Sequence, residues 1–563
     1  MSFSSLSHRA RAVVLRYAQR RGIPEDKLAE FLKPRLDWRQ HVLPHAEKAA
    51  ARFKTAIKKK ERLVIFGDYD ADGVTSVAIL LRFFAECTSW QPAWKLPNRQ
   101  QDHYGLEIEM ARKITGEFQP TLLVAIDNGT NSAEAVAWLR QQGIETIIID
   151  HHPITNLAND AVAIINPKAH EATQSGDLAS LSAAGLALLL CGHLAAAWNC
   201  AHQWDDISAT MIAGLGTLGD AVPLSPLNRA IIRNAIAHFN TPASLARCVG
   251  LKALMPNDGQ RLSQRRIQFE VVPPINALGR LGAADPGVHL LTTHDPAEAA
   301  RIARDCRTLN DERKAIQKQI VAQGVEQGRA LLERNSALST LILADAGWLP
   351  GVVGPAASRV AEQLGRSTIL LGPDQEAGRW KGSGRAFQSD HLGNWMEAVK
   401  QRGWVDRGGG HAAAVGVALH TAQLEQLRAA AITLPMSRIP GYEPAHEVAG
   451  EIEELSDAEW LQVCAAIEPS GHGNPAPLIS ARHARLLQAP TELRAGQSGK
   501  IWGYKGSFCT RGRTLSVVWT DLDRAIKQWR KGGRYHLHLE LSPRGDNGRI
   551  YINWLTRRCE PAA

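Results

Sequence analysis

Carboxylate and imidazole groups gather in two short segments of the chain. Residues 68–73 read Asp-Tyr-Asp-Ala-Asp-Gly, and residues 150–152 read Asp-His-His. Because like charges repel, carboxylates at alternate positions need a positive compensation, and a divalent cation is the simplest one. Mg²⁺ and Mn²⁺ prefer carboxylate oxygen, and Mn²⁺ also accepts imidazole. The pattern therefore predicts a site for divalent metal ions.

Short apolar runs, rich in β-forming residues, come directly before these polar residues. The runs cover residues 63–66, 122–126, 146–149 and 162–165, with helix-compatible sequence between them. This alternation predicts β-α-β units with a parallel sheet, that is, an α/β fold. Ligands bind outside the carboxyl ends of the strands in such sheets, so we expect the residues that follow the runs to meet in one site. They are Asp68, Asp127, Asp150 and Asn166.

The rest of the chain predicts further structural units. Residues 1 to about 60 read as helical, and the polar stretch 296–334 predicts one long connecting helix. A second α/β segment follows, and its expected features are strands at 340–344 and 368–371 and glycine-rich turns at 382–384 and 408–410. The stretch 468–477, rich in glycine and proline, separates it from a last segment of alternating residues, which predicts a small β-barrel.

The positive charge lies at the C-terminal end. The net charge of the chain is +9, and residues 481–563 hold 16 Lys and Arg against 6 Asp and Glu, a balance of +10. Basic residues that neutralise phosphates release counterions, so we expect this segment to bind a polyanion, with a surface kept for solubility as the alternative. Aromatic residues for base stacking interleave there: Trp502, Tyr504, Phe508, Trp519, Trp529 and Trp554.

The sequence carries neither a membrane-span signal nor a secretory signal. Its longest candidate apolar run, 186–190, is far below the roughly 20 residues that a membrane span needs. The first 21 residues contain five arginines but lack an apolar stretch and a cleavage site. We therefore expect a cytoplasmic protein without a membrane partner.

The ordered motifs resemble those of the DHH phosphoesterase superfamily, and within it the RecJ-type exonucleases. The acidic motifs that carry the resemblance are 68–73, Asp127, 150–152 and the Gly-Thr-Leu-Gly-Asp that ends at Asp220. Further matching stretches are 97–99, 274–280, 351–354, 381–385 and 409–411. The similarity runs from about residue 60 to about residue 480. A single glycine pattern would be unspecific, whereas the ordered set is specific.

This resemblance implies four parts. They are a parallel-sheet DHH domain with a helical N-terminal extension (1–295), a long connecting helix (296–335), a second α/β, DHH-associated, substrate-binding lobe (336–445) and an OB-like nucleic-acid-binding β-barrel (446–563). It also implies a single-stranded-DNA-specific 5′-to-3′ exonuclease that hydrolyses phosphodiester bonds with two metal ions, Mn²⁺ or Mg²⁺, in DNA recombination and repair. Besides single-stranded DNA, a single-strand-binding protein or a helicase is the partner to expect.

The resemblance assigns roles at the metal site. Asp70 and Asp72 would bind different ions, Asp127 would bridge them, and the second ion would also bind His151 and Asp220. Two ions about 3.5 to 4 Å apart can activate a water and stabilise the leaving oxygen. The catalytic set would be His152, Asp127 and Asp68, with Asp150 as a further supporting acid. His152 would stabilise the transition state or donate a proton, with a purely buttressing role as the alternative.

A second set of residues is implied to bind the substrate: Arg99, Asn276, Arg280, Ser383, Arg385 and His411. Guanidinium groups bind phosphate bidentately, so the arginines and Ser383 would form a pocket for a terminal 5′ phosphate. That pocket would fix the 5′ end at a set distance from the metal ions. His411 follows three glycines and would contact the strand from the second lobe.

Two positions depart from the RecJ-type pattern. Leu349 stands where a histidine is usual, and Pro355 is also unusual after Gly354. Both leave the metal ligands intact, so we expect catalysis with altered substrate handling. The alternatives are a phosphodiesterase for short oligonucleotides or cyclic dinucleotides, and a catalytically silent nucleic-acid-binding scaffold. The basic C-terminal segment argues against the first alternative, and the complete set of acids and histidines argues against the second.

Overall fold

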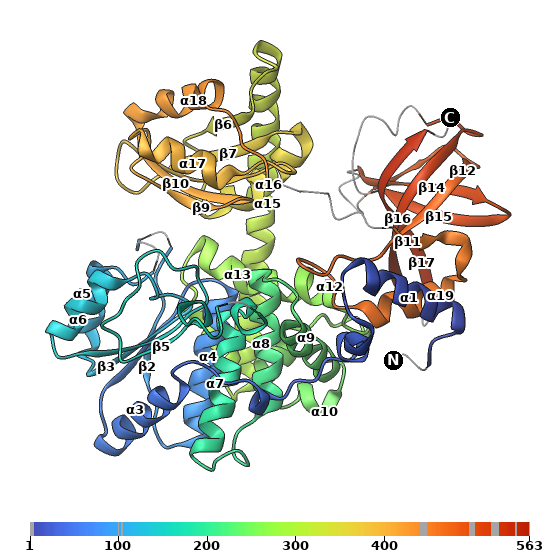
Figure 1. The fold of residues 1–563 in the computed structure, drawn as a ribbon. Helices are drawn as coiled ribbons and strands as arrows, with labels where there is room; N and C mark the ends of the chain where they lie inside the picture. The colour runs from blue at the N-terminus through green and yellow to red at the C-terminus, as the bar shows by residue number, and fades with distance from the viewer. Residues whose placement is uncertain are drawn as a thin grey trace.

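A computed structural model describes residues 5–99, 101–102, 105–174, 176–439, 448–494, 501–519, 529–546 and 549–561. Figure 1 shows a large domain built on the first sheet, a second lobe joined to it by one long helix, and a C-terminal β-domain to the side. No helix of the described residues is long and apolar enough to cross a membrane.

The first sheet is entirely parallel, with strand order β2-β1-β3-β4-β5. Its strands are β1 (Leu63–Phe66), β2 (Ala93–Lys95), β3 (Leu122–Ile126), β4 (Glu145–Ile149) and β5 (Ala163–Ile165). The structure confirms the predicted α/β class and the four predicted runs. β2 was missed because it is a three-residue edge strand that is only half-buried and carries no apolar run.

Helices cover both faces of this sheet because alternate strand residues point to opposite sides. Leu63 and Ile65 pack with α3 (Ala46–Lys59), α4 (Ala71–Cys87) and α7 (Ala183–Ala197). Val64 and Phe66 pack with α5 (Ile108–Phe118) and α6 (Ala133–Gln141). The domain continues with α8 (Asp206–Asp220), α9 (Pro226–Phe239), α10 (Pro242–Leu245), α11 (Val249–Leu254), α12 (Gln264–Arg266), the π-helix η6 (Ile267–Val271), α13 (Val272–Leu281) and α14 (Asp285–Thr292). Apolar residues of α8, α9, α11, η6, α13 and α14 extend its core.

The predicted connecting helix is present as α15 (Pro296–Arg334), a single helix of 39 residues. Asp295 caps its N-terminus by accepting a hydrogen bond from the Ala297 N–H, and Pro296 fits the first turn because its missing N–H is not needed there. Ile302 packs against the large domain, whereas Ile320 packs in the second lobe. The helix therefore packs against both the large domain and the second lobe, and Figure 1 shows it running from one to the other.

The second lobe has a mixed sheet with strand order β6-β7-β8-β10-β9. Its elements are β6 (Thr340–Ala344), α16 (Pro350–Leu364), β7 (Ser367–Pro373), β8 (Arg379–Arg385), α17 (Leu392–Gln401), β9 (Arg407–His411), β10 (Ala414–His420) and α18 (Leu424–Thr433). The expected glycine-rich turns at 382–384 and 408–410 are wrong, since both segments are strands. A Cβ on Gly382 would lie 2.2 Å from the Leu370 carbonyl oxygen, so close approach rather than turning requires that glycine.

The C-terminal domain contains a closed ring of strands. Its elements are β11 (Val448–Glu451), α19 (Asp457–Ile467), β12 (Leu478–Leu486), β13 (Thr491–Arg494), β14 (Ile501–Thr510), β15 (Arg513–Trp519), β16 (Arg534–Asp546) and β17 (Arg549–Pro561). Pairing runs from β12 through β16, β17, β15 and β14 back to β12. Phe508 is fully buried inside, while Tyr504 and Trp529 are partly buried. The side chains of Trp502, Trp519 and Trp554 lie outside the described residues.

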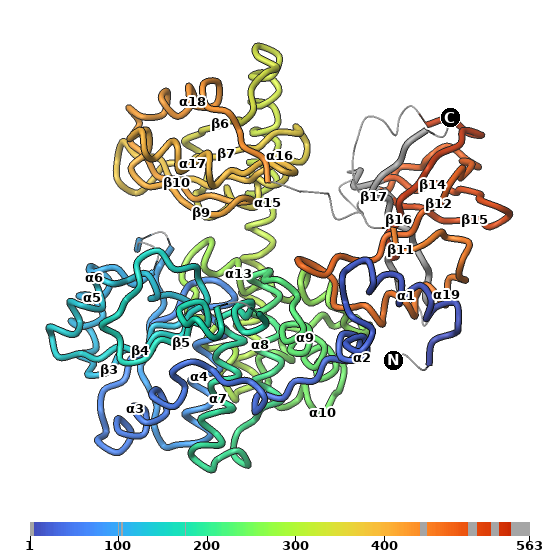
Figure 2. Tube along the Cα trace, in the orientation of Figure 1, coloured from blue at the N-terminus to red at the C-terminus, as the bar shows by residue number. Residues whose placement is uncertain are grey.

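The N-terminal helices pack on this last domain, although the sequence grouped them with the first. Apolar residues of α1 (His8–Arg20) and α2 (Leu28–Leu32) share one core with α19 and the barrel strands. Figure 2 shows α1 beside α19 of this domain. The periodicity of an amphipathic helix predicts an apolar face but not its partner. The residue limits of the four parts stay a prediction.

Arg229 of α9 joins three parts of the chain. Its guanidinium donates hydrogen bonds to the carbonyl oxygens of Phe31 (2.8 Å), Ile467 (2.8 Å) and Pro469 (3.1 Å). The guanidinium also lies 4.0 Å from the centre of the Phe31 ring. The side chain is 1% exposed, so these contacts anchor the N-terminal helices, the end of α19 and the loop that follows it to the large domain.

Candidate metal centre

The segment after β1 turns sharply into α4 and presents its acids at the edge of the sheet. Asp70 caps the helix, because its Oδ1 accepts hydrogen bonds from the N–H groups of Asp72 (2.9 Å) and Gly73 (3.1 Å). A Cβ on Gly73 would lie 2.4 Å from the Asp68 carbonyl oxygen, so only glycine fits this turn. Asp68 is buried beside it, with its Oδ1 accepting from the Tyr69 N–H at 2.7 Å.

Asp72 is held by a helix that is distant in sequence. The N–H groups of Ala183 and Ala184, at the start of α7, donate to its two carboxylate oxygens at 2.7 and 3.0 Å. Gly216 of α8 leaves room for the same carboxylate, since a Cβ there would lie 2.6 Å from its Oδ1. These contacts fix the orientation of a side chain that is 1% exposed.

The ends of β3 and β4 bring further ligand groups to the same edge. The Nε2 of His151 lies 3.3 Å from Asp127 Oδ1, 3.6 Å from Asp220 Oδ2 and 3.9 Å from Asp72 Oδ2. Asp127 has a φ of 61°, a left-handed backbone that Asp tolerates better than most residues. All five predicted metal ligands therefore lie together at one end of the sheet.

The ligand atoms form overlapping groups within 4.8 Å of one another. One group is Asp68, Asp70 and Asp127, and a second is Asp72, His151 and Asp220. Asp68, predicted as a supporting acid, thus lies in a position to bind an ion itself. A third group joins Asp127 to His151, His152 and Asp150.

The charge balance of these groups fits divalent cations. Burial and then Asp70 raise the pKa of Asp68 to about 8 and of Asp72 to about 7, and burial and then Asp72 raise that of Asp220 to about 8. The pKa of Asp127 is raised well above its usual value for the same reasons. Burial and His152 lower the pKa of His151 to about 3, so this neutral imidazole brings no charge. Oxygen ligands with one neutral nitrogen suit Mn²⁺ or Mg²⁺.

Asp150 and His152 form a hydrogen-bonded pair beside the metal ligands. His152 Nδ1 lies 2.7 Å from Asp150 Oδ1, and the same oxygen accepts from the His151 N–H at 2.7 Å. The Thr130 N–H donates to the other Asp150 oxygen at 3.0 Å. Burial opposes the charge on His152, but the contact with Asp150 prevails and raises its pKa to about 9. His152 is therefore an imidazolium at neutral pH.

Pro355 explains how Arg280 is positioned. A proline at this place in α16 has no N–H to donate to the Gly351 carbonyl one turn earlier. Nη1 of Arg280 donates to that carbonyl at 3.2 Å instead. Burial and then Arg99 lower the pKa of Arg280 to about 10. The unusual proline thus favours a contact between the large domain and the second lobe. The other departure, Leu349, is half-buried and packs against the core of the second lobe.

The remaining predicted substrate residues come from both bodies. Arg385 donates from Nη1 to Ser383 Oγ (2.6 Å) and the Gly384 carbonyl (2.8 Å), and burial and Arg99 lower its pKa. The Arg99 guanidinium lies 5.0 Å from the Tyr69 ring centre. Asn276 Oδ1 accepts from the Ala71 N–H at 2.9 Å, so it also supports the metal-site turn. His411 lies at the end of β9, where burial, Arg385 and His472 lower its pKa.

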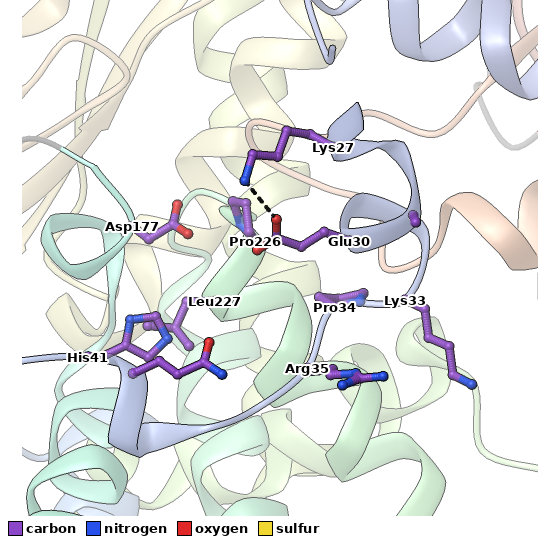
Figure 3. A pocket seen from close by; sticks show the side chains of 11 residues that line it. Lys27, Glu30, Lys33, Pro34, Arg35, His41, Asp177, Pro226 and Leu227 are labelled. Atoms are coloured by element: carbon purple, nitrogen blue, oxygen red, sulfur yellow. Dashed lines mark hydrogen bonds and ion pairs between the residues drawn. The ribbon is translucent and has the colours of Figure 1, made fainter. Parts of the chain in front are cut away.

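The sequence motifs did not reveal two further groups at this site. Arg313 of α15 lies near Arg280 and lowers its pKa, and it is held by Asn310 and Gln317. Lys168 donates to the His151 carbonyl. Neither residue belongs to a motif. A cavity of about 640 Å³ lies elsewhere, between residues 27–41 and the start of α9. Figure 3 shows its lining residues, none of which belongs to the predicted site.

Comparison with known proteins agrees with this geometry. Residues 62–217 match the model of the DHH family, N-terminal domain, and residues 335–434 match the DHHA1 domain. The single-stranded-DNA-specific exonuclease RecJ of Escherichia coli is 30% identical over 418 residues, which cover 72% of this chain and 71% of that protein. The chain belongs to the RecJ family. RecJ of Bacillus subtilis is also 30% identical, over 78% of this chain, but the match spans only 54% of that relative.

A solved structure shows the same fold. RecJ of Thermus thermophilus in complex with Mn²⁺ matches with a TM-score of 0.78 at 24% identity, over 100% of this chain and 78% of that one. The RecJ family fold therefore covers all the described parts of this chain, including the connecting helix.

The raised pKa values predict a pH dependence for the metal-free protein. Asp68, Asp72 and Asp220 retain protons near neutral pH that the unfolded chain has released, and His152 also retains its proton. The free energy of unfolding should then fall as pH rises from 6.5 to 8.5, by about 1.4 kcal/mol per pH unit for each retained proton. Urea unfolding with a chelator should show this fall, and saturating Mn²⁺ should reduce it. If the free energy of unfolding fell equally steeply with pH in the presence and in the absence of Mn²⁺, the assignment of these acids to a metal site would be contradicted.

Proposed function

We propose that this protein is a single-stranded-DNA-specific 5′-to-3′ exonuclease that hydrolyses phosphodiester bonds with two divalent metal ions, Mn²⁺ or Mg²⁺, in DNA recombination and repair. The observation that carries the proposal is the convergence of buried acids and one neutral histidine at the strand ends, opposite a cluster of arginines from both bodies. When bound, the ions would supply charge stabilisation at the phosphodiester and make water a stronger nucleophile.

Each residue of the metal centre then has a proposed task. Asp70 and Asp72 would hold different ions, Asp127 shares one ligand group with Asp70 and another with His151, and Asp68 belongs with Asp70. His151 and Asp220 complete the second group. Asp150 keeps His152 protonated and oriented through the contact at Nδ1. An imidazolium near the scissile phosphate can stabilise its developing negative charge or give a proton to the leaving oxygen.

Polarity is proposed to come from the arginine cluster. Burial and then the charge of Arg99 lower the pKa of Arg280 and of Arg385, which favours an anion among these arginines. A terminal 5′ phosphate has the charge and geometry that guanidinium groups bind best. Ser383, which contacts Arg385, adds a hydroxyl to this pocket, while Asn276 steadies the turn and His411 contacts the strand.

The C-terminal domain is proposed to be an OB-like barrel that holds the strand. The closed ring of five strands, including one parallel pair, β15 with β17, supports this. A single-strand-binding protein or a helicase remains the expected protein partner.

Charge removal on this domain should change the salt dependence of binding. A truncation before residue 481 would expose the core shared with the N-terminal helices, so point substitutions are preferable. Arg485, Lys505 and Arg511 are exposed. Replacing all three with glutamine should weaken single-strand binding and reduce the slope of log K against log salt by about 2, at roughly 0.7 per phosphate. Binding titrations at several salt concentrations measure this, and an unchanged slope would assign these charges to another task.

The activity itself is tested with end-labelled single strands, Mn²⁺ and purified protein. Strands with a 5′ phosphate should release labelled mononucleotide from the 5′ end, and duplex should resist. Degradation of only very short oligomers would favour the phosphodiesterase alternative. No turnover with any divalent metal would leave a binding scaffold.

A further inference from the structure

Phe269 is an exposed aromatic residue on an unusual piece of backbone. Its side chain is 62% exposed, and among the four large apolar side chains that are exposed in the described ranges it is the only aromatic one. It lies in the π-helix η6 between α12 and α13. π-Helical turns occur frequently at functional sites, so an aromatic side chain presented to solvent there needs an explanation.

The segment around Phe269 lies beside the metal centre. Val272, three residues later, packs against Gly219, since a Cβ on Gly219 would lie 3.3 Å from its Cγ1. Gly219 is the neighbour of the candidate ligand Asp220. On the other side, Gln264 exchanges two hydrogen bonds with Ser470, in the loop between α19 and β12 of the C-terminal domain, at 2.6 and 2.7 Å. The segment therefore bridges the metal centre and the loop 468–477 of the C-terminal domain.

The exposed face of this segment is turned toward the C-terminal domain. Arg265 lies one turn before Phe269, and its guanidinium is 5.6 Å from the centre of the Phe269 ring. The same guanidinium is 4.0 Å from Glu540 of β16. Figure 1 shows α12 on the side of the large domain that faces the barrel. A strand passing from the metal centre to the barrel would cross this face.

We propose that Phe269, with Arg265 beside it, is a stacking platform for a nucleobase of the single strand between the metal centre and the C-terminal domain. The proposal rests on the proposed function. A flat ring offers a π-face to any base, and the neighbouring guanidinium can contact the adjoining phosphate. A base paired in a duplex cannot stack on the ring, so the platform would favour single strands.

The test compares strands with and without bases. In an Asp127→Asn background, which keeps the strand uncut, Phe269→Ala should weaken binding of a base-bearing single strand by about 5- to 150-fold. Binding of an abasic strand of the same length should not change. Phe269→Trp should retain the wild-type affinity, and Ile432→Ala, another exposed apolar residue, serves as the matched control.

Several results would overturn the proposal. Phe269→Ala could bind the base-bearing strand as tightly as the parent, or it could lose affinity equally for the abasic strand. Full strand affinity together with lost binding to a single-strand-binding protein would make the patch a protein-docking site instead. Failure of the unmutated enzyme to degrade single strands would reject the proposed function, whereas normal degradation with an inert Phe269 would reject only the platform.

Discussion

Asp127→Asn should reduce strand cleavage by on the order of 10³-fold or more and leave strand binding nearly unchanged. Asp127 belongs to two of the three ligand groups and lies 3.3 Å from His151 Nε2, so both ions depend on its carboxylate. Asparagine preserves the shape of the side chain and tolerates the φ of 61° at this position. The loss should therefore come from the missing charge and not from unfolding.

The measurement is single-turnover cleavage of an end-labelled strand together with a binding titration. Asp160→Asn is the matched control, because Asp160 pairs with Arg140 on the surface and belongs to none of the ligand groups. The control should cleave like the wild type. Cleavage by Asp127→Asn within a few fold of wild type would refute the two-ion assignment.

Arg385→Gln should abolish the preference for a 5′-phosphorylated end. A charge-assisted hydrogen bond contributes about 1.5–3 kcal/mol, so the wild type should degrade 5′-phosphate strands about 10- to 150-fold more efficiently than 5′-hydroxyl strands. The variant should degrade 5′-phosphate strands and 5′-hydroxyl strands at the same rate, namely the rate at which the wild type degrades 5′-hydroxyl strands. Its side chain contacts Ser383 and Gly384 and not the metal ligands, so the chemical step itself should survive.

Competition between the two strand types at limiting enzyme measures this preference. Arg359→Gln is the control, since Arg359 is an exposed residue of α16 paired with Glu362 at 3.2 Å. It should keep the wild-type preference. If Arg385→Gln also kept that preference, the end-binding pocket would have to be elsewhere.

Much of the fold follows from local patterns in the sequence. The buried strands β1 and β3 were predicted from unbroken apolar runs, and α15 from a polar, helix-favouring stretch without proline after Pro296. The acids of the metal site could be predicted because parallel strands end at one edge, which brings 68–72, Asp127 and 150–152 together. Local residue types were sufficient to predict the strands and the metal-site acids wherever the chain forms regular β-α-β units.

Long-range contacts account for what the sequence did not predict. The support of Asp72 by the start of α7 joins residues 111 positions apart. The contact of Arg280 with the Gly351 carbonyl depends on Pro355, which leaves that carbonyl without its helical donor. The presence of this proline in the sequence does not by itself predict the contact. The glycines of β8 and β9 favour turns in the sequence because glycine is common in turns, whereas in the structure tight packing requires Gly382. Phe269 belonged to no motif.

The most direct test of the two-ion site is crystallography with anomalous scattering from Mn²⁺. We expect two manganese peaks about 3.5 to 4 Å apart. One should contact Asp70, the other should contact His151 and Asp220, and Asp127 should contact both. A single ion, or ions bound away from Asp127, would contradict the account.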